Sequence, residues 1–416
     1  MDETVCRVWL SGALTPGSAC AKLFDQFDSA EDVWHASSEE LKLAGAGDAL
    51  IRRLENRDLA EAARIAGFAE RYGVSIVTLR DAAYPDLLRG IPNPPYLLYV
   101  LGRLPDFEKT LSVGVVGTRR MTEYGMERAY RVSYELAAAG VCVISGLARG
   151  IDGVAATAAI EAGGTTVAVL GCGLDTVYPP EHRPLMAAVA KNGAVISEYP
   201  PGTPPAARNF PVRNRIISGL SRGVYVVEAG AESGAVLTAA EARRQGRAVF
   251  ALPGRAGDPE SEGTNRLLCE GARAATDACD LLEFFRDEFP SAINGDAYAR
   301  ATCTSDPDAE ALAVMGVLLP GQSRGKPERR TAVRKERPVR TEVSAKPEPA
   351  RPPKEEKLPE DERLRRFLEL VPPGERVCAD SFAGHGYGTF EAMNLLSILE
   401  ISGFLTSVPG GMYVRN

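Results

Sequence analysis

The chain has 416 residues, enough for two or three domains, and its 45% hydrophobic and 25% charged residues are typical of a soluble globular protein. The net charge of −7 argues against a generally basic nucleic-acid coat but does not exclude a local basic site. No apolar run reaches the roughly 18 residues of a membrane span, and the N-terminus is acidic where a signal peptide would be basic. We therefore expect a cytoplasmic protein. Its eight cysteines and three histidines show neither metal-ligand spacing nor a disulfide framework, so no metal or cofactor is predicted.

Residues 1–75 predict a small helical domain. Amphipathic patterns of helical period occupy three segments: 14–27, 29–45 and 48–73. The turns at Pro16-Gly17 and at 45–47 resemble helix-hairpin-helix turns, whose backbone amides can hold a DNA phosphate. The preferred interpretation is a structural helical domain of the SAM or helix-hairpin-helix type.

Residues 76–288 predict an α/β domain. Six apolar segments alternate with helical ones: 111–117, 141–145, 165–171, 194–198, 223–229 and 248–254. Strands that are apolar on both faces must be covered by helices, so the pattern predicts a doubly wound, Rossmann-like parallel sheet. Ligands of such sheets bind at the carboxyl ends of the strands.

The segment 289–357 is predicted to be a disordered, basic, proline-rich linker. Its part from 324 to 357 holds twelve basic residues, six acidic residues and six prolines, a composition that favours an extended chain. Residues 358–416 then predict a winged-helix-like domain, with a helix, a second helix at 389–403 and a hairpin around a Pro-Gly-Gly turn. Because 389–401 contains no Lys or Arg, a protein partner or self-contact suits this domain better than DNA.

The turn after the first predicted strand has the features of an anion site. Gly117 lets the backbone approach a ligand, Thr118 offers a hydroxyl, and Arg119 and Arg120 lie beside a helix N-terminus. The turn is not a dinucleotide fingerprint, because the GxGxxG spacing is missing and Ser145, in place of an acidic residue, ends the second strand. The alternative is that both arginines are solvated surface charges.

The loops after the second and fifth strands add further candidates. Ser145 and Gly146 leave the second strand, and Asp152 is either a helix cap or a ligand contact. Ser233-Gly234 opens a helix whose free amides can take another phosphate.

Two residues are candidates for catalysis. Glu228, at the tip of the fifth strand, is the best candidate for a catalytic carboxylate, but no second carboxylate or histidine is a clear partner. Cys172 is interpreted as a small residue packed in a tight turn, because a nucleophile needs a base and only tertiary folding, which the sequence does not show, could bring His182 to it. No catalytic residue is predicted.

The segment 208–221 is the most informative. Around Phe210, just before an apolar helix, it places four cationic or amide side chains: Arg208, Arg213, Asn214 and Arg215. Single-stranded nucleic acid requires this mixture, arginine for phosphates and an aromatic face for a base. The alternative is that Phe210 belongs to the core and that the arginines pair with Glu198 or Glu228.

In order along about residues 80–280, these motifs resemble the DNA-processing protein A family, also called DprA or Smf: GTRR, SGLARGID, NFPVRNRIISGLS, VVEAGAESGAVLTA and GRAVFALPG. The resemblance implies an extended Rossmann-like fold that binds single-stranded DNA and helps to load the recombinase RecA during natural transformation. It also implies a homodimer formed through the sheet domain. The DNA-binding residues that it implies are Gly117, Thr118, Arg119, Arg120, Ser145, Gly146, Phe210, Arg213, Asn214, Arg215, Ser233 and Gly234.

The sequence departs from the family's pattern at two places. Ala156 stands where the family often has His, and Ala207 where some members have Lys, with Arg208 beside it. We expect a mediator that is not an enzyme. A more distant resemblance, to nucleotide-binding hydrolases of the lysine-decarboxylase-like or phosphoribohydrolase group, is the alternative, with Glu228 and Arg215 as candidates. Their PGGxGTxxE string is missing from EAGAESGAVLTAAEA, which disfavours that alternative.

Overall fold

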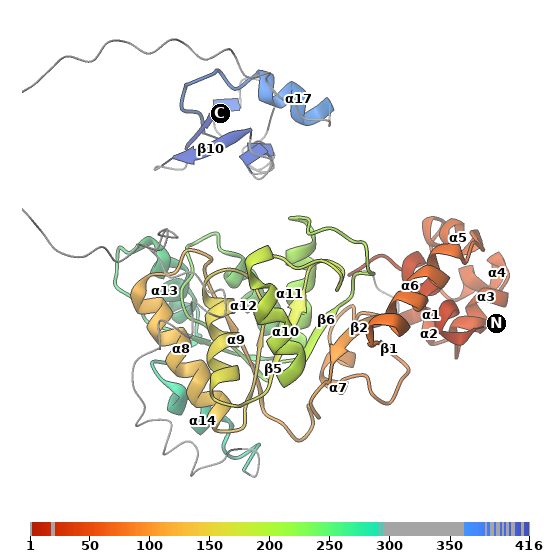
Figure 1. The fold of residues 1–416 in the computed structure, drawn as a ribbon, viewed down its shortest axis with the longest axis horizontal. Helices are drawn as coiled ribbons and strands as arrows, with labels where there is room; N and C mark the ends of the chain where they lie inside the picture. Colours follow the sequence, from red (N-terminus) through yellow and green to blue (C-terminus); the bar gives the residue numbers. More distant parts are fainter. Residues whose placement is uncertain are drawn as a thin grey trace, which may run out of the picture. The chain divides into compact units, whose positions relative to one another are not determined.

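The computed structural model describes residues 2–17, 21–290 and 293 and, in the C-terminal part, 362–378 with shorter stretches between 381 and 415 (Figure 1). They form two compact units, one within 1–328 and the other within 329–416. The predicted linker at 289–357 lies outside the described residues, apart from Phe289, Pro290 and Ile293. Phe289 is buried in the core of the first unit, so the folded chain continues at least to that residue.

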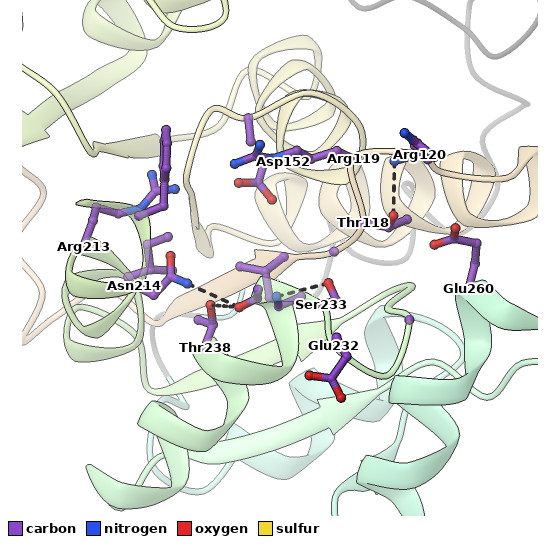
Figure 2. Close-up of a pocket in the computed structure, with 18 residues that line it drawn as sticks. Thr118, Arg119, Arg120, Asp152, Arg213, Asn214, Glu232, Ser233, Thr238 and Glu260 are labelled. Atoms are coloured by element: carbon purple, nitrogen blue, oxygen red, sulfur yellow. Dashed lines mark hydrogen bonds between the residues drawn. The ribbon is translucent and has the colours of Figure 1, made fainter. Parts of the chain in front are cut away.

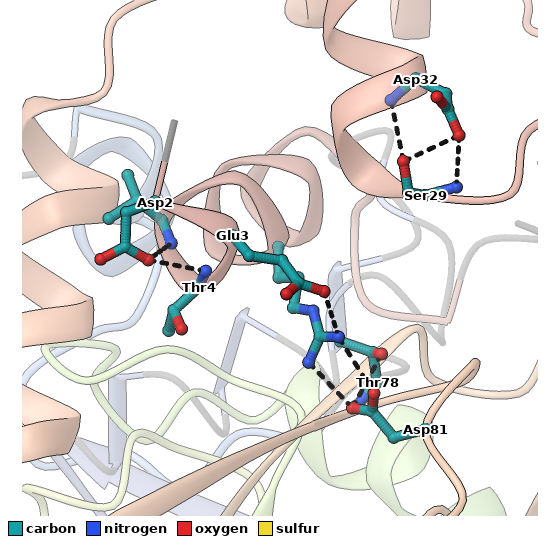
Figure 3. Close-up of polar contacts among 9 residues, drawn as sticks. Asp2, Glu3, Thr4, Ser29, Asp32, Thr78 and Asp81 are labelled. Atoms are coloured by element: carbon teal, nitrogen blue, oxygen red, sulfur yellow. Dashed lines mark hydrogen bonds and ion pairs between the residues drawn. The ribbon is translucent and has the colours of Figure 1, made fainter.

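The described N-terminal residues form short helices: α1 (Glu3–Ala13), α2 (Ala21–Phe24), α3 (Ala30–His35), α4 (Ser38–Leu43), α5 (Asp48–Glu55) and α6 (Ala60–Tyr72). Ser29 and Ser37 begin α3 and α4 with capping boxes, in which the N3 carboxylate accepts a hydrogen bond from the cap backbone N–H. Figure 3 shows the Ser29 box. These caps divide the predicted helical segment 29–45 into two helices. Helix α1 was not part of the predicted patterns.

The helical part is tied to the edge of the sheet by an ion pair. The guanidinium of Arg7 in α1 lies 3.1 Å from the carboxylate of Asp81. That carboxylate also accepts hydrogen bonds from the backbone and hydroxyl of Thr78, the last residue of β1 (Val74–Thr78) (Figure 3). The stacked rings of Phe24 and Tyr96, with centroids 4.9 Å apart, add an apolar contact. The helices and the sheet therefore belong to one compact unit.

The remaining strands of the first unit are β2 (Leu97–Gly102), β3 (Ser112–Val116), β4 (Cys142–Ser145), β5 (Thr166–Leu170), β6 (Gly193–Ser197), β7 (Gly223–Val226), β8 (Ala248–Ala251) and β9 (Arg273–Ala274). Their order in the sheet is β1-β2-β6-β5-β4-β3-β7-β8-β9, parallel from β6 to β9, with β1 and β2 antiparallel at one edge. The Rossmann-like parallel sheet is confirmed, and all six predicted strands are present. The prediction did not include β1, β2 and the two-residue β9.

Helices cover both faces of this sheet. Helix α8 (Glu123–Ala138) packs on α9 (Ile151–Glu161), and α9 packs on α10 (Arg183–Asn192). Helix α11 (Asn209–Gly219) packs on α12 (Gly234–Arg244). Because parallel crossovers are right-handed, reversing the strand order after β6 puts α11 and α12 on the face opposite α8 and α9. Every residue from Ile151 to Ala159 is buried, as expected for a helix enclosed between neighbours.

The other short helical elements described in the first unit are α7 (Asp86–Arg89), α13 (Glu262–Cys269), α14 (Ala278–Phe285) and the 3-10 turns Pro180–His182 and Pro259–Ser261. The turn Pro259–Ser261 and α13 follow β8 at the carboxyl edge of the sheet. They bring a loop rich in polar residues beside the end of β7, where Ala229 donates a backbone hydrogen bond to Glu260.

The second unit has its own small core. Helix α17 (Glu362–Glu369) and the antiparallel strands β10 (Leu405–Val408) and β11 (Met412–Arg415) surround buried apolar side chains, among them Phe367, Leu368 and Leu405. The predicted second helix at 389–403 and the Pro-Gly-Gly turn lie largely or wholly outside the described residues. The winged-helix-like class of this unit stays a prediction.

Candidate functional site

The main cavity of the site lies where the strand order reverses. After β3 the chain builds β4, β5 and β6 on one side, then returns to place β7 on the other side of β3. The loops that follow β3 and β7 therefore separate and leave a crevice at the carboxyl edge, which is where open α/β sheets bind ligands. A cavity of about 610 Å³, called the first cavity below, is found there.

Nine of the twelve predicted site residues line the first cavity: Gly117, Thr118, Arg119, Arg120, Phe210, Arg213, Asn214, Ser233 and Gly234. Figure 2 shows that the labelled side chains among them come from three places, the turn after β3, helix α11 and the start of α12. Asp152, for which two roles were open, also lines the cavity, as do Glu232, Thr238 and Glu260, which were not predicted. Glu260 lies in the loop after β8, whose glycines mark it as a strand-end loop, but no motif singles out Glu260 itself.

The turn after β3 holds two exposed cations. Its backbone is fixed because Thr118 donates a hydrogen bond to the carbonyl of Glu228, and its hydroxyl accepts one from the backbone of Arg120 (Figure 2). A Cβ at Gly117 would lie 2.5 Å from Ile151, so only glycine fits between the turn and α9. Arg119 and Arg120 are exposed, and neither forms a salt bridge with a described residue. Their charges are therefore available to an anion.

Helix α11 presents one face to the cavity. It begins at Asn209, earlier than the prediction, which put the arginine cluster before the helix. Residues 210, 213, 214 and 217 recur at helical spacing and all line the cavity. The half-buried ring of Phe210 has the guanidinium groups of Arg119 and Arg213 at 5.2 and 5.8 Å from its centre. Cation–π contacts thus already organise this side of the site.

Arg213 is buried and fixed. Its guanidinium donates hydrogen bonds to the carbonyls of Gly146 and Val169, which follow or end β4 and β5. Burial lowers the pKa of Arg213 to about 10, which still leaves the group charged at neutral pH. Its Nε has no hydrogen-bond partner in the described residues. A fixed and incompletely satisfied cation favours binding of an anionic ligand.

Asp152 is a buried carboxylate that, like Glu232 and Glu260, lines the first cavity. Of the two alternatives for Asp152, the helix cap does not hold, because Gly150 is the N-cap of α9 and Asp152 lies inside the first turn. Its Oδ2 accepts a hydrogen bond from the backbone of Gly146 at 3.0 Å. Burial raises the pKa of Asp152, and the positive charge of Arg213 opposes that rise. Burial and the charge of Arg213 therefore act in opposite directions on the ionisation of this one acid of the lining.

Helix α12 begins at the cavity. Ser233 is its N-cap, and its hydroxyl accepts a hydrogen bond from the backbone of Ala235. Asn214 donates to the carbonyl of Gly234 at 3.3 Å, which joins α11 to the start of α12 (Figure 2). The start of α12 therefore lines the same cavity as the arginines, as an anion site at a helix N-terminus requires.

Three predicted site residues do not line the first cavity. Ser145 donates its hydroxyl to the carbonyl of Asp152, and Gly146 binds Asp152 and Arg213 through its backbone. Both residues therefore hold Asp152 and Arg213, which line the cavity, without lining it themselves. Arg215 is buried and forms a 2.6 Å ion pair with Glu198, the pairing that the sequence analysis considered as the alternative. Arg215 and Arg213 are two positions apart on one helix, so they cannot face the same side.

The candidates for catalysis are engaged in structural contacts. The carboxylate of Glu228 accepts hydrogen bonds from the backbone and the hydroxyl of Thr122 at the start of α8. Cys172 is buried, and burial raises the pKa of its thiol to about 11. His182 is buried too, with Nδ1 bonded to the carbonyl of Leu147, and burial lowers its pKa. In these contacts, the three residues do not form a pair of nucleophile and general base.

No helix among the described residues is both long and apolar enough to cross a membrane. The same residues contain no group of three or more His, Cys, Asp or Glu side chains placed to hold a metal ion.

The family model of DNA recombination-mediator protein A matches residues 75–286, about half of the chain. This chain belongs to that family. Protein Smf of Synechocystis sp. is 38% identical over 266 residues, which cover 63% of this chain and 67% of the relative. DNA processing protein DprA of Bacillus subtilis is 40% identical over 219 residues, covering 53% and 73%. The X-ray structure of DprA from Streptococcus pneumoniae is 34% identical with a TM-score of 0.58, and the match covers 67% of this chain and 95% of that chain.

The predicted resemblance is therefore confirmed at the level of the family. The matched range coincides with the sheet from β1 to α14, the part of the chain that builds the first cavity. Membership makes the chain a DNA-processing recombination mediator. The roles of the individual site residues stay predictions.

The Arg215–Glu198 pair gives a test of its structural role. Removing one partner leaves the other buried and uncompensated, so Arg215→Met should lower the free energy of unfolding by about 3–5 kcal/mol. The double variant Arg215→Met, Glu198→Leu should recover much of that loss. Urea unfolding followed by circular dichroism measures both. The matched control is Arg119→Met, an exposed arginine, which should change stability by at most about 0.5 kcal/mol. Equal effects of Arg215→Met and Arg119→Met would contradict the structural assignment.

Proposed function

We propose that this chain binds single-stranded DNA in the first cavity and loads RecA onto that DNA during natural transformation, in the cytoplasm. The observation that carries the proposal is the arrangement of Arg119, Arg120 and Arg213 around the half-buried ring of Phe210. Arginines neutralise phosphates, and an aromatic face stacks on a base of any identity. Family membership supports the recombination role.

The preference for a single strand rests on the form of the site. Both Phe210 and the start of α12 lie at a crevice between loops, and a base reaches such a ring only when it is unpaired and unstacked. The whole chain is acidic, so attraction is confined to the cavity and is not spread over the surface.

The proposal includes no catalytic step. A hydrolase of the phosphoribohydrolase group would need Glu228 and Arg215 at the substrate, but Glu228 binds the start of α8 and Arg215 binds Glu198. Neither lines the first cavity. Incubation with nucleoside monophosphates should therefore release no free base.

We also propose a homodimer formed through the sheet domain. Strand β9 lies at the end of the sheet, and the nearby ring of Phe284 in α14 is 41% exposed. The guanidinium of Arg273 in β9 lies 4.3 Å from the centre of that ring. An exposed aromatic side chain beside an open strand edge favours burial against a second copy.

The DNA-binding proposal is tested by fluorescence anisotropy with a single-stranded oligonucleotide over a salt series. Three cations line the cavity, so the logarithm of affinity should fall against the logarithm of salt with a slope of about −2. Arg119→Ala, Arg120→Ala should flatten the slope by about 1.4. Phe210→Ala should weaken binding by about 1–3 kcal/mol at unchanged slope.

The matched control for Phe210→Ala is Tyr72→Ala, because Tyr72 is an exposed aromatic residue on helix α6 outside the first cavity. It should leave affinity unchanged. A salt-independent affinity, or equal losses in the Phe210 and Tyr72 variants, would reject the site. RecA-dependent strand exchange measures recombinase loading in the same variants.

Asp152 predicts a pH dependence of DNA binding. Arg213, Arg119 and the backbone of Gly146 face its carboxylate, and the ionised form repels a phosphate. Affinity should therefore rise as pH falls through the raised pKa of Asp152, where the group becomes neutral. Asp152→Asn should bind more tightly at neutral pH and lose this dependence, while Asp48→Asn, an exposed control on α5, should retain it. Weaker binding by Asp152→Asn at every pH would instead mean that the carboxylate acts mainly to hold Arg213.

The dimer is tested at Phe284. Phe284→Glu places a charge in the proposed interface and should convert the dimer into a monomer, as measured by light scattering after size-exclusion chromatography. Leu237→Glu is the control, because Leu237 is 51% exposed on α12, away from β9. A wild-type monomer, or dissociation by Leu237→Glu alone, would contradict the proposed interface.

A further inference from the structure

A second cavity adjoins the first. It has a volume of about 580 Å³ and lies at the carboxyl edge between β7 and β8. The first turn of α8, the loop after β8 and residues 258–261 line it. Glu260 lines both cavities, so the two spaces meet at that side chain. Figure 2 shows Glu260 at the border of the first cavity, on the side of Thr118 and Arg120.

The second cavity has an accessible aromatic face. The ring of Tyr124, in the first turn of α8, is 42% exposed. Its hydroxyl donates a hydrogen bond to the carbonyl of Pro253 at 3.2 Å, and the guanidinium of Arg128 lies 5.7 Å from the ring centre. These two contacts fix the ring, which lowers the entropy lost when a flat ligand packs on it.

Hydrogen-bond acceptors surround this ring. Asp258 and Glu260 line the cavity, and neither forms a salt bridge with a described residue. Ser261 also lines it and is only 6% exposed, yet its hydroxyl makes no hydrogen bond within the described part of the chain. The hydroxyl oxygen is therefore open to the cavity and available to a ligand atom.

The charge of the second cavity excludes a phosphate. Its lining includes several carboxylates and one arginine, Arg255, whereas the arginines Arg119, Arg120 and Arg213 line the first cavity. A flat ligand that donates hydrogen bonds suits carboxylates beside a tyrosine. Among the parts of a DNA strand, this describes a base with an exocyclic amino group, since Asp and Glu accept from cytosine N4.

We infer that the second cavity takes a base of the bound single strand that carries an exocyclic amino group. The base packs on Tyr124, and its amino group donates to Asp258 or Glu260. This inference rests on the proposed binding of single-stranded DNA in the first cavity. It adds a preference among bases to a site whose other contacts, arginine and a stacking ring, do not distinguish one base from another.

The test compares two oligonucleotides of equal length, one of 5-methyldeoxycytidine and one of thymidine. The two bases carry the same methyl group and differ at position 4, amino against carbonyl, and in whether N3 carries hydrogen. Anisotropy should give the 5-methylcytosine strand an affinity at least about fivefold higher. In Asp258→Asn, Glu260→Gln this ratio should fall to about one.

Glu232→Gln is the matched control. Glu232 lines only the first cavity, so removing its charge should strengthen binding of both strands and leave the ratio unchanged. Tyr124→Leu should weaken both strands and reduce the ratio. Circular dichroism and thermal unfolding establish that each variant is folded.

The outcomes separate this inference from the proposal on which it depends. Failure of wild-type protein to bind either strand would reject single-stranded DNA binding itself. Binding with a ratio of one, or a ratio unchanged in Asp258→Asn, Glu260→Gln, would overturn the inference alone. A third outcome is that this variant no longer stimulates RecA while the wild type shows no base preference. That result would indicate that the acidic cavity binds a basic protein surface, and it would also overturn the inference.

Discussion

Arg213 donates hydrogen bonds to the carbonyls of Gly146 and Val169, and these contacts fix helix α11 against the carboxyl ends of β4 and β5. Because α11 connects β6 to β7 across the reversal of strand order, its position determines the shape of the crevice beside β3. Phe210 and Asn214 lie on the same helical face as Arg213 and also line the cavity. The opposite side of α11 is held by the ion pair of Arg215 with Glu198. Helix α11 is thus held on two sides by arginines: Arg213 lines the cavity, and Arg215 forms a structural ion pair.

The second anchor also reaches the N-terminal helices. Glu198 accepts a hydrogen bond from the backbone of Gly17, at 3.3 Å, in addition to its bond with Arg215. The loop between α1 and α2 therefore touches the same buried pair that positions α11. Together with the Arg7–Asp81 pair at β1, this makes the helical part a support for the sheet and its cavity.

The sequence predicted six of the strands because buried parallel strands are apolar on both faces and helical segments separate them. It missed β1 and β2, which are antiparallel at one edge of the sheet, and β9, which has only two residues. At the site, the glycine, hydroxyl and arginines of the turn from Gly117 to Arg120 were recognisable because they are consecutive in the sequence, whereas the contacts of that turn with Glu228 and Ile151 were not. Arg215 was assigned to the ligand because the start of α11 was placed too late. With the helix beginning at Asn209, a spacing of two residues puts Arg213 and Arg215 on different sides.

Glu260 and Glu228 show which features of the site cannot be predicted from local sequence patterns. The prediction gave Glu228 a chemical role from its position at a strand end, but only its neighbour in three dimensions, Thr122, reveals that its carboxylate holds the N-cap residue of α8. Glu260 joins the site from a loop that follows a different strand, and no local pattern contains that information. Arg119 and Arg120 are exposed and stay hydrated, so their charges cost the fold little stability. Buried Arg213 fixes the geometry of the site. With acids on either side, in Asp152 and Glu260, the positive potential is confined to the space between them, which suits a strand held at one place on an acidic protein.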